Sequence, residues 1–186
     1  MEYLTHCTRC PDSVHCCKNI RELGFVSVSV EEARKIKELT GQAFNEFLDF
    51  GPLPRETIRA CTEDNKGSEG ELRMAQMDGG RILRLKTAPT GDCIFLKGRK
   101  CTIYGGRPGI CRIYPFWYRQ KNGEMDVTLY ERPSDCSVSK ASEEKPPLSF
   151  QEKEEILSQA RLLEAQRNLP KAVVRQFVEE NRISCL

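Results

Sequence analysis

This sequence has few histidines, no long apolar run and almost no excess of one charge. Its mean hydropathy is -0.53, and no apolar stretch approaches the ~20 residues that a bilayer-spanning helix needs. The 29 lysines and arginines nearly balance the 27 aspartates and glutamates, for a net charge of +2. Nucleic-acid-binding proteins usually carry a concentrated basic excess. We therefore expect neither a membrane nor a nucleic acid as a partner.

The first residues likewise lack the apolar core of a secretory signal peptide, so we expect a cytoplasmic location. Against this background, ten cysteines in 186 residues stand out. In a reducing compartment, clustered thiols are more often metal ligands or redox groups than disulfides. The cysteines are therefore the feature from which the function is best inferred.

The hydrophobic pattern predicts an α+β fold in a single domain, the number that a chain of this length normally forms. Ser29 and Glu32 form a capping-box pattern at the start of an amphipathic helix, which Gly51 and Pro52 would end. The helix would bury Val30, Ala33, Ile36, Leu39, Ala43, Phe44 and Phe47. The other predicted strands are short, at 24–28, 81–86, 94–96, 101–104 and 127–130, with a turn at Asn122 and Gly123. A second helix would be capped by Ser149 and Glu152 and would bury Ile156, Ala160 and Leu163. A last helix would begin at Pro170 and bury Val173, Val174 and Phe177.

In this interpretation a small, irregular sheet and loops, ligated by cysteines, pack with flanking helices. Residues 1–136 would form the cysteine-cluster metal-binding domain. Residues 137–186 would be a C-terminal helical extension packed on the same domain.

Eight of the cysteines fall into two groups. Eight thiolates would suit two four-coordinate metal sites, or one cluster with additional structural or redox cysteines. Cys7 and Cys10 form a Cys-x-x-Cys pair, a spacing that directs two sulfurs at one metal. Cys16 and Cys17 are adjacent, so their side chains diverge; either they serve different sites, or one ligates while the other packs. The first group is Cys7, Cys10, Cys16 and Cys17, and the second is Cys93, Cys101, Cys111 and Cys136.

The spacing favours an iron–sulfur cluster, of the 4Fe–4S type, over zinc. Structural zinc usually takes two tight pairs of ligands, whereas here only Cys7 and Cys10 form such a pair. Iron–sulfur clusters are held by four thiolates at varied spacings. Zn²⁺ in a non-catalytic module for protein interaction stays open as the alternative. A metal-free redox pair of Cys7 and Cys10 ranks last, because no predicted strand precedes Cys7.

Several short motifs together resemble one known family. They are Cys7-Thr-Arg-Cys10 with Cys16-Cys17, Asp92-Cys93-Ile-Phe-Leu96, Cys101-Thr-Ile-Tyr104, Arg107-Pro108 and Cys111-Arg112-Ile-Tyr114-Pro115-Phe116. In this order and approximate spacing they resemble the YkgJ-type cysteine-cluster proteins, described as zinc- or iron-chelating. The resemblance implies eight cysteine ligands but no particular reaction.

Flagellin lysine N-methylases are distantly similar to the same family. That resemblance implies a cluster domain in protein methylation, with a protein as partner or substrate. A redox role in electron transfer is instead suggested by the thiolate-rich, histidine-poor ligand set with its irregular spacing. The chain shows no glycine-rich strand–turn–helix fingerprint for S-adenosylmethionine. The sequence therefore leaves open whether this protein is an enzyme.

The residues near the cysteines have possible roles at the metal site and also ordinary structural explanations. Arg107 and Arg112 would hydrogen-bond cluster sulfurs or bind an anionic partner, and an ordinary surface role is equally compatible. The aromatic residues between 104 and 117 would form a hydrophobic wall over the site. We expect no ligand role for His6, His15, the isolated Cys61, or Cys185, which would be a thiol in a flexible tail.

Overall fold

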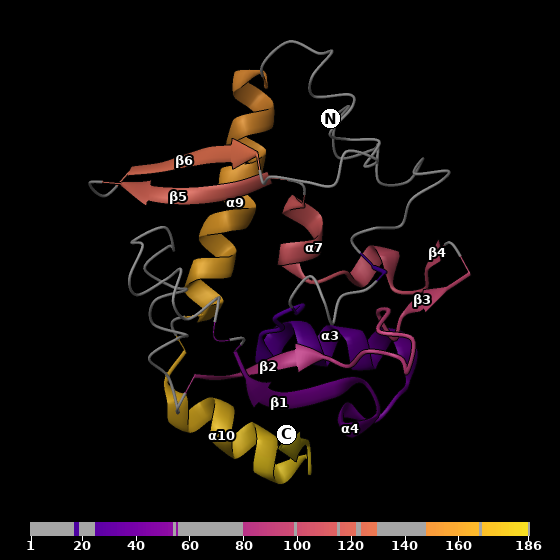
Figure 1. Cartoon of the computed structure of the whole chain (residues 1–186). Coiled ribbons are helices and arrows are strands. Elements are labelled where there is room, and N and C mark those ends of the chain that lie inside the picture. Colours follow the sequence, from indigo (N-terminus) through magenta and orange to yellow (C-terminus); the bar gives the residue numbers. More distant parts are fainter. Residues whose placement is uncertain are drawn as a thin grey trace.

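The computed structural model describes residues 17–18, 25–53, 55, 80–98, 100–114, 116–121, 124–129, 148–167 and 169–185. These parts combine helices with small sheets, which confirms the α+β prediction (Figure 1). The helices are α3 (Val30–Thr40), α4 (Phe44–Phe47), the 3-10 turn η2 (Tyr104–Gly106), α7 (Gly109–Ile113), α9 (Phe150–Arg167) and α10 (Lys171–Glu180). The strands are β1 (Leu48–Pro52), β2 (Arg81–Leu85), β3 (Leu96–Lys97), β4 (Lys100–Cys101), β5 (Phe116–Lys121), β6 (Glu124–Leu129) and β7 (Ser184–Cys185).

Helix α3 begins as its sequence predicts and ends earlier. The Ser29 side chain accepts from the Glu32 N–H at 3.1 Å, and the Glu32 carboxylate accepts from the Ser29 N–H at 2.9 Å. Gly41 ends the helix in the left-handed conformation, with φ of 71°, which glycine adopts without steric cost. The prediction of one helix up to Gly51 is therefore wrong.

The residues after α3 form the short helix α4 and then strand β1. Strand β1 lies at the centre of a three-stranded sheet in the order β2-β1-β7, antiparallel to β2 and parallel to β7. Two residues predicted to be buried on the long helix, Leu39 and Ala43, are exposed instead. Of the strand predicted at 24–28, residues 25–28 lie in the described part, and this segment bonds to β2 through Val26 and Val28.

The first hydrophobic core lies between α3, α4, the three-stranded sheet and α10. The rings of Phe44 and Phe177 meet edge to face, with centroids 4.8 Å apart, and so join α4 to α10. On α10, Phe177 is buried as predicted, whereas Val173 is 42% exposed. Among the buried members are Ala33, Ile36, Phe47, Leu48, Phe50, Leu83, Leu85, Phe95, Ile103 and Val178.

The second hydrophobic core lies between α7, the β5–β6 hairpin and α9. The cap of α9 and its buried residues Ile156, Ala160 and Leu163 are as predicted. In the hairpin Lys121 pairs with Glu124. The predicted turn at Asn122 and Gly123 lies outside the described residues. Strand β5 was not predicted.

The predicted aromatic wall over the cysteines is wrong for two of its members. Phe116, at 4% exposure, belongs to the second core, and Tyr104 is 37% exposed. Among the described helices, none combines the length and apolar composition that a membrane span requires.

Candidate metal centre

Four of the eight predicted ligands lie in the described part of the chain. They are Cys17, Cys93, Cys101 and Cys111. The other four, Cys7, Cys10, Cys16 and Cys136, lie outside it, as do His6, His15 and Cys61. The structure can therefore test the second cysteine group more fully than the first.

Cys93 meets the first cysteine group through the backbone. Its N–H donates to the Cys17 carbonyl at 2.7 Å. The chain reaches this point from β2 through a turn in which the Ala88 N–H donates to the Asp92 carbonyl at 2.8 Å and Gly91 has φ of 87°. Cys17 and Cys93, one from each cysteine group, are thus adjacent in the fold although they are distant in the sequence.

The small β3–β4 hairpin then carries the chain from Cys93 to Cys101. The Leu96 N–H donates to the Cys93 carbonyl at 2.9 Å, and Leu96 pairs with Cys101. Gly98, with φ of 60°, allows the tight reversal between the two strands. The hairpin therefore sets the spacing between these two cysteines.

Cys111 reaches the same region on α7. The η2 turn and Pro108 precede this helix, and the Cys111 N–H donates to the Pro108 carbonyl at 2.9 Å. Proline suits this position because it has no N–H to satisfy at a helix start. The Arg-Pro motif thus directs the chain into the helix that carries Cys111.

All four described cysteines contact one core. Cys93 is a buried member of the first core, and Cys17, Cys101 and Cys111 are partly buried against it. None of the four is joined in a disulfide. Thiolates are the donors that zinc and iron–sulfur clusters take, so the residue types fit either group.

The described cysteines do not by themselves define a coordination sphere. Within the described ranges, no three cysteine, histidine, aspartate or glutamate side chains come together as a metal-holding group. The assignment of all eight ligands therefore stays a prediction.

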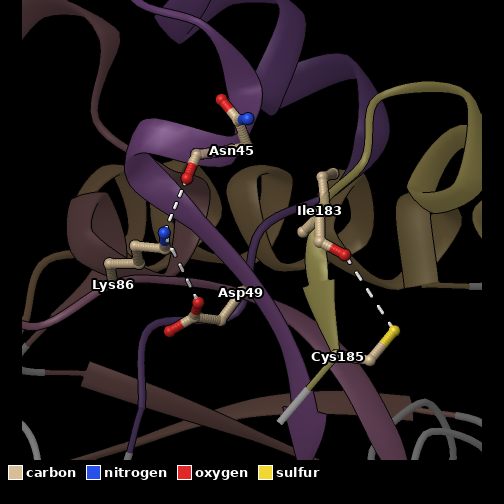
Figure 2. A network of polar contacts seen from close by, with 5 residues as sticks. All are labelled: Asn45, Asp49, Lys86, Ile183 and Cys185. Carbon is tan, nitrogen blue, oxygen red and sulfur yellow. Dashed lines mark hydrogen bonds and ion pairs between the residues drawn. The ribbon is translucent and has the colours of Figure 1, made fainter.

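Lys86 ties the cysteine-bearing loop to the first core (Figure 2). Its Nζ donates to the Asn45 carbonyl at 2.6 Å and lies 3.9 Å from the Asp49 carboxylate. Its backbone N–H donates to the Phe47 carbonyl at 2.9 Å, and its own carbonyl accepts from Ile94, next to Cys93, at 3.3 Å. One residue thereby links α4 and β1 to the start of the candidate site.

Cys185 is separate from the other four described cysteines. It lies on β7, which pairs with β1 at the sheet edge opposite β2, and its side chain is exposed. Its sulfur lies 4.0 Å from the carbonyl oxygen of Ile183, the residue before the strand (Figure 2). The prediction of a flexible tail is wrong here, because the segment is a paired strand.

Arg107 and Arg112 each donate a hydrogen bond to a backbone carbonyl near α7. Arg107 Nε donates to the Tyr104 carbonyl at 3.1 Å, and its guanidinium stacks 3.7 Å from the centre of the Tyr104 ring. Arg112 Nε donates to the Arg107 carbonyl at 2.8 Å. Their predicted contact with cluster sulfurs stays a prediction.

Sequence reasoning missed a second role of Glu32. Besides capping its own helix, this carboxylate accepts from the Gly109 N–H, at the start of α7, at 2.6 Å. The capping-box spacing was a visible signal for the local bond. Nothing in the sequence pattern indicates the distant one.

A cysteine-rich α+β domain with thiols from separate segments on one core is typical of a metal-chelating domain. A family model described as "Putative zinc- or iron-chelating domain" matches residues 6–155. The chain therefore belongs to this family of cysteine-cluster, metal-chelating domains, and the predicted resemblance is confirmed.

Comparison with individual proteins adds sequence similarity but no activity. An uncharacterized protein of Methanocaldococcus jannaschii is 41% identical over 58 residues, which are 30% of this chain and 31% of that protein. The chain thus matches about a third of that relative's length. No solved structure matches.

Proposed function

We propose that this protein binds an iron–sulfur cluster, of the 4Fe–4S type, through its clustered cysteines. One observation carries the proposal: Cys17, Cys93, Cys101 and Cys111 come from separate segments and pack against the same core. A cluster is larger than a single ion, and chains commonly wrap it with ligands from irregularly spaced positions. The family assignment supports metal chelation without choosing between iron and zinc.

When bound, such a cluster supplies one-electron transfer. The chain's contribution is to hold the thiolates against an apolar core, because a low-dielectric surrounding tunes a cluster's reduction potential. We propose a redox role in the cytoplasm with a protein partner. A role in protein methylation rests only on the distant resemblance to flagellin lysine N-methylases.

Purification without oxygen tests the metal directly. We expect a brown protein that absorbs near ~400 nm, as thiolate-bound iron does, and that contains iron with acid-labile sulfide in equal amounts. Cys93→Ser and Cys111→Ser should each lower the iron and sulfide content sharply. Cys185→Ser is the matched control, since this thiol is exposed on another edge of the sheet.

Zinc is the second candidate, because the family description names it equally. In that case the protein is a non-catalytic module whose metal stabilises the fold for protein interaction. A colourless protein with stoichiometric zinc and no sulfide would contradict the iron–sulfur proposal and support this one.

A further inference from the structure

A small cavity is bordered by α3, η2, α7 and α9. Its volume is about 70 Å³, several times the ~15 Å³ that one water needs. Its polar lining consists of Glu32, Lys35, Arg107, Arg112 and Gln159. The cavity therefore has room for a small polyatomic group, and three of its five polar lining side chains are cations.

The cavity's charge is not balanced by the residues around it. Three cations, Lys35, Arg107 and Arg112, face one carboxylate, Glu32, so the lining has a formal charge of 3 − 1 = +2. That carboxylate already accepts from the Ser29 and Gly109 backbones, at 2.9 and 2.6 Å. In the part of the chain that the structure describes, no carboxylate forms an ion pair with any of the three cations.

The two arginines are oriented without using their terminal nitrogens. Each donates from Nε to a backbone carbonyl, and the Tyr104 ring supports Arg107 from one side. Within the described residues, the terminal N–H groups of both guanidinium forks have no hydrogen-bond partner and can therefore donate to a ligand. Such forks match the oxygens of phosphate and carboxylate, and prior orientation lowers the entropic cost of binding.

We propose that this cavity binds a doubly charged oxyanion of the phosphate class. The excess of two positive charges matches a phosphate dianion, and the volume suits a single phosphate group rather than a nucleotide. Gln159 adds a neutral amide donor to the same wall. None of these residues is a predicted metal ligand, so the inference does not depend on which metal is bound. Of the two roles predicted for Arg107 and Arg112, contact with cluster sulfurs or with an anion, it assigns them the second.

Titration at constant ionic strength tests the proposal. Inorganic phosphate is added at about pH 8 with sodium chloride as the ionic control, and binding is followed by calorimetry and by NMR shifts of the α7 amides. We expect saturable binding that Arg112→Gln weakens at least about tenfold and Lys35→Gln at least about fivefold. Lys35→Gln is the variant least expected to disturb folding. Lys35 is exposed and forms no hydrogen bond or ion pair within the described residues.

Arg161→Gln is the matched control. It removes the same charge from α9, the helix that carries Gln159, but Arg161 does not line the cavity. Among the described residues, Arg161 forms an ion pair with the exposed Glu154 alone, at 3.7 Å. Its affinity for phosphate should stay within about twofold of the native value. Arg112→Lys should bind more weakly than the native protein, since lysine keeps the charge but loses the fork.

Parallel titrations with O-phosphoserine and acetate identify the source of the anion. Tighter binding of O-phosphoserine assigns the cavity to a phosphate monoester, and equal binding assigns it to the free anion; both support the proposal. A response to phosphate no greater than that to chloride, tighter binding of acetate, or equal losses in Arg161→Gln and Arg112→Gln would overturn it.

Discussion

Glu32 is a single side chain that serves two helices at once. It is 9% exposed, and its two oxygens accept from the backbone at the starts of α3 and α7. Charged hydrogen bonds of this kind are stronger than neutral ones, and a buried N–H without its acceptor is costly. Gly109, the first residue of α7, donates its N–H to Glu32 at this junction.

Glu32→Ala should lower the free energy of unfolding by about 2–3 kcal/mol, because the buried Gly109 N–H loses its acceptor. Chemical denaturation measures the difference. Glu31→Ala is the control: this neighbour is exposed in the same first turn, and its loss should cost only about 0.5 kcal/mol through the helix dipole. Equal losses for the two variants would show that the bond to Gly109 contributes little.

Gly109→Ala should destabilise the protein by about 1–3 kcal/mol, the usual cost of overpacking. A Cβ at this position would lie 2.8 Å from Leu163 Cδ2 and 2.9 Å from its Cγ. Thermal or chemical unfolding checks the loss. At Gly105 an added Cβ meets nothing within 4 Å, so Gly105→Ala should change stability by less than about 0.5 kcal/mol; a similar loss there would count against the steric explanation.

At the scale of elements, a buried polar contact joins the β5–β6 hairpin to α9. The fully buried Tyr118 hydroxyl donates to the Glu164 carboxylate, which is itself 9% exposed. Ile156, Ala160 and Phe116 supply the apolar contacts around it. A hairpin alone is marginally stable in water, so its attachment to α9 determines whether it forms.

Tyr118→Phe should cost about 1–3 kcal/mol, since it leaves a buried carboxylate with one hydrogen bond fewer. The difference in chemical denaturation against the native protein gives the value. Tyr104→Phe is the control, because that side chain is 37% exposed and loses only a solvated hydroxyl. If both variants unfold alike, the contact with Glu164 is not stabilising.

At the scale of the whole molecule, α7 connects the two cores. Ile110 and Cys111 pack against the first core, whereas Ile113 is fully buried in the second. The same helix borders the cationic cavity through Gly109 and Arg112. A structural change at the cysteines could therefore be transmitted through α7 to the hairpin, to α9 and to the cavity.

Metal removal should loosen the cysteine side of the molecule first. If the proposed centre is correct, a chelator should raise amide hydrogen exchange at Leu96, Thr102 and Cys111, because metal binding and local folding are coupled. The amides that pair β5 with β6 should respond less, since the described members of their core include no cysteine. Hydrogen-exchange mass spectrometry with and without chelator distinguishes this local loss of protection from a uniform one. A uniform loss over the whole molecule would contradict the prediction.

Local chemistry was predictable where it acts within a few residues. The two capping boxes, at Ser29 and Ser149, formed as predicted, because their bonds join residues three apart in the sequence. The strand β2 also lies where its local pattern predicted it, although its partner β1 is distant in the sequence. The α3 end was misjudged because Gly41 was not recognised as a left-handed cap within an apolar pattern that continues through Phe44 and Phe47.

The sequence by itself determined the α+β class, the starts of the main helices and the membership in a metal-chelating family, since these follow from periodicity, capping and motif order. Only the tertiary structure decided that Cys17 lies beside Cys93, that Glu32 joins α3 to α7, and that three cations border one cavity. These contacts join segments far apart along the chain, and their free energy depends on the packing that brings them together. No local pattern contains that information.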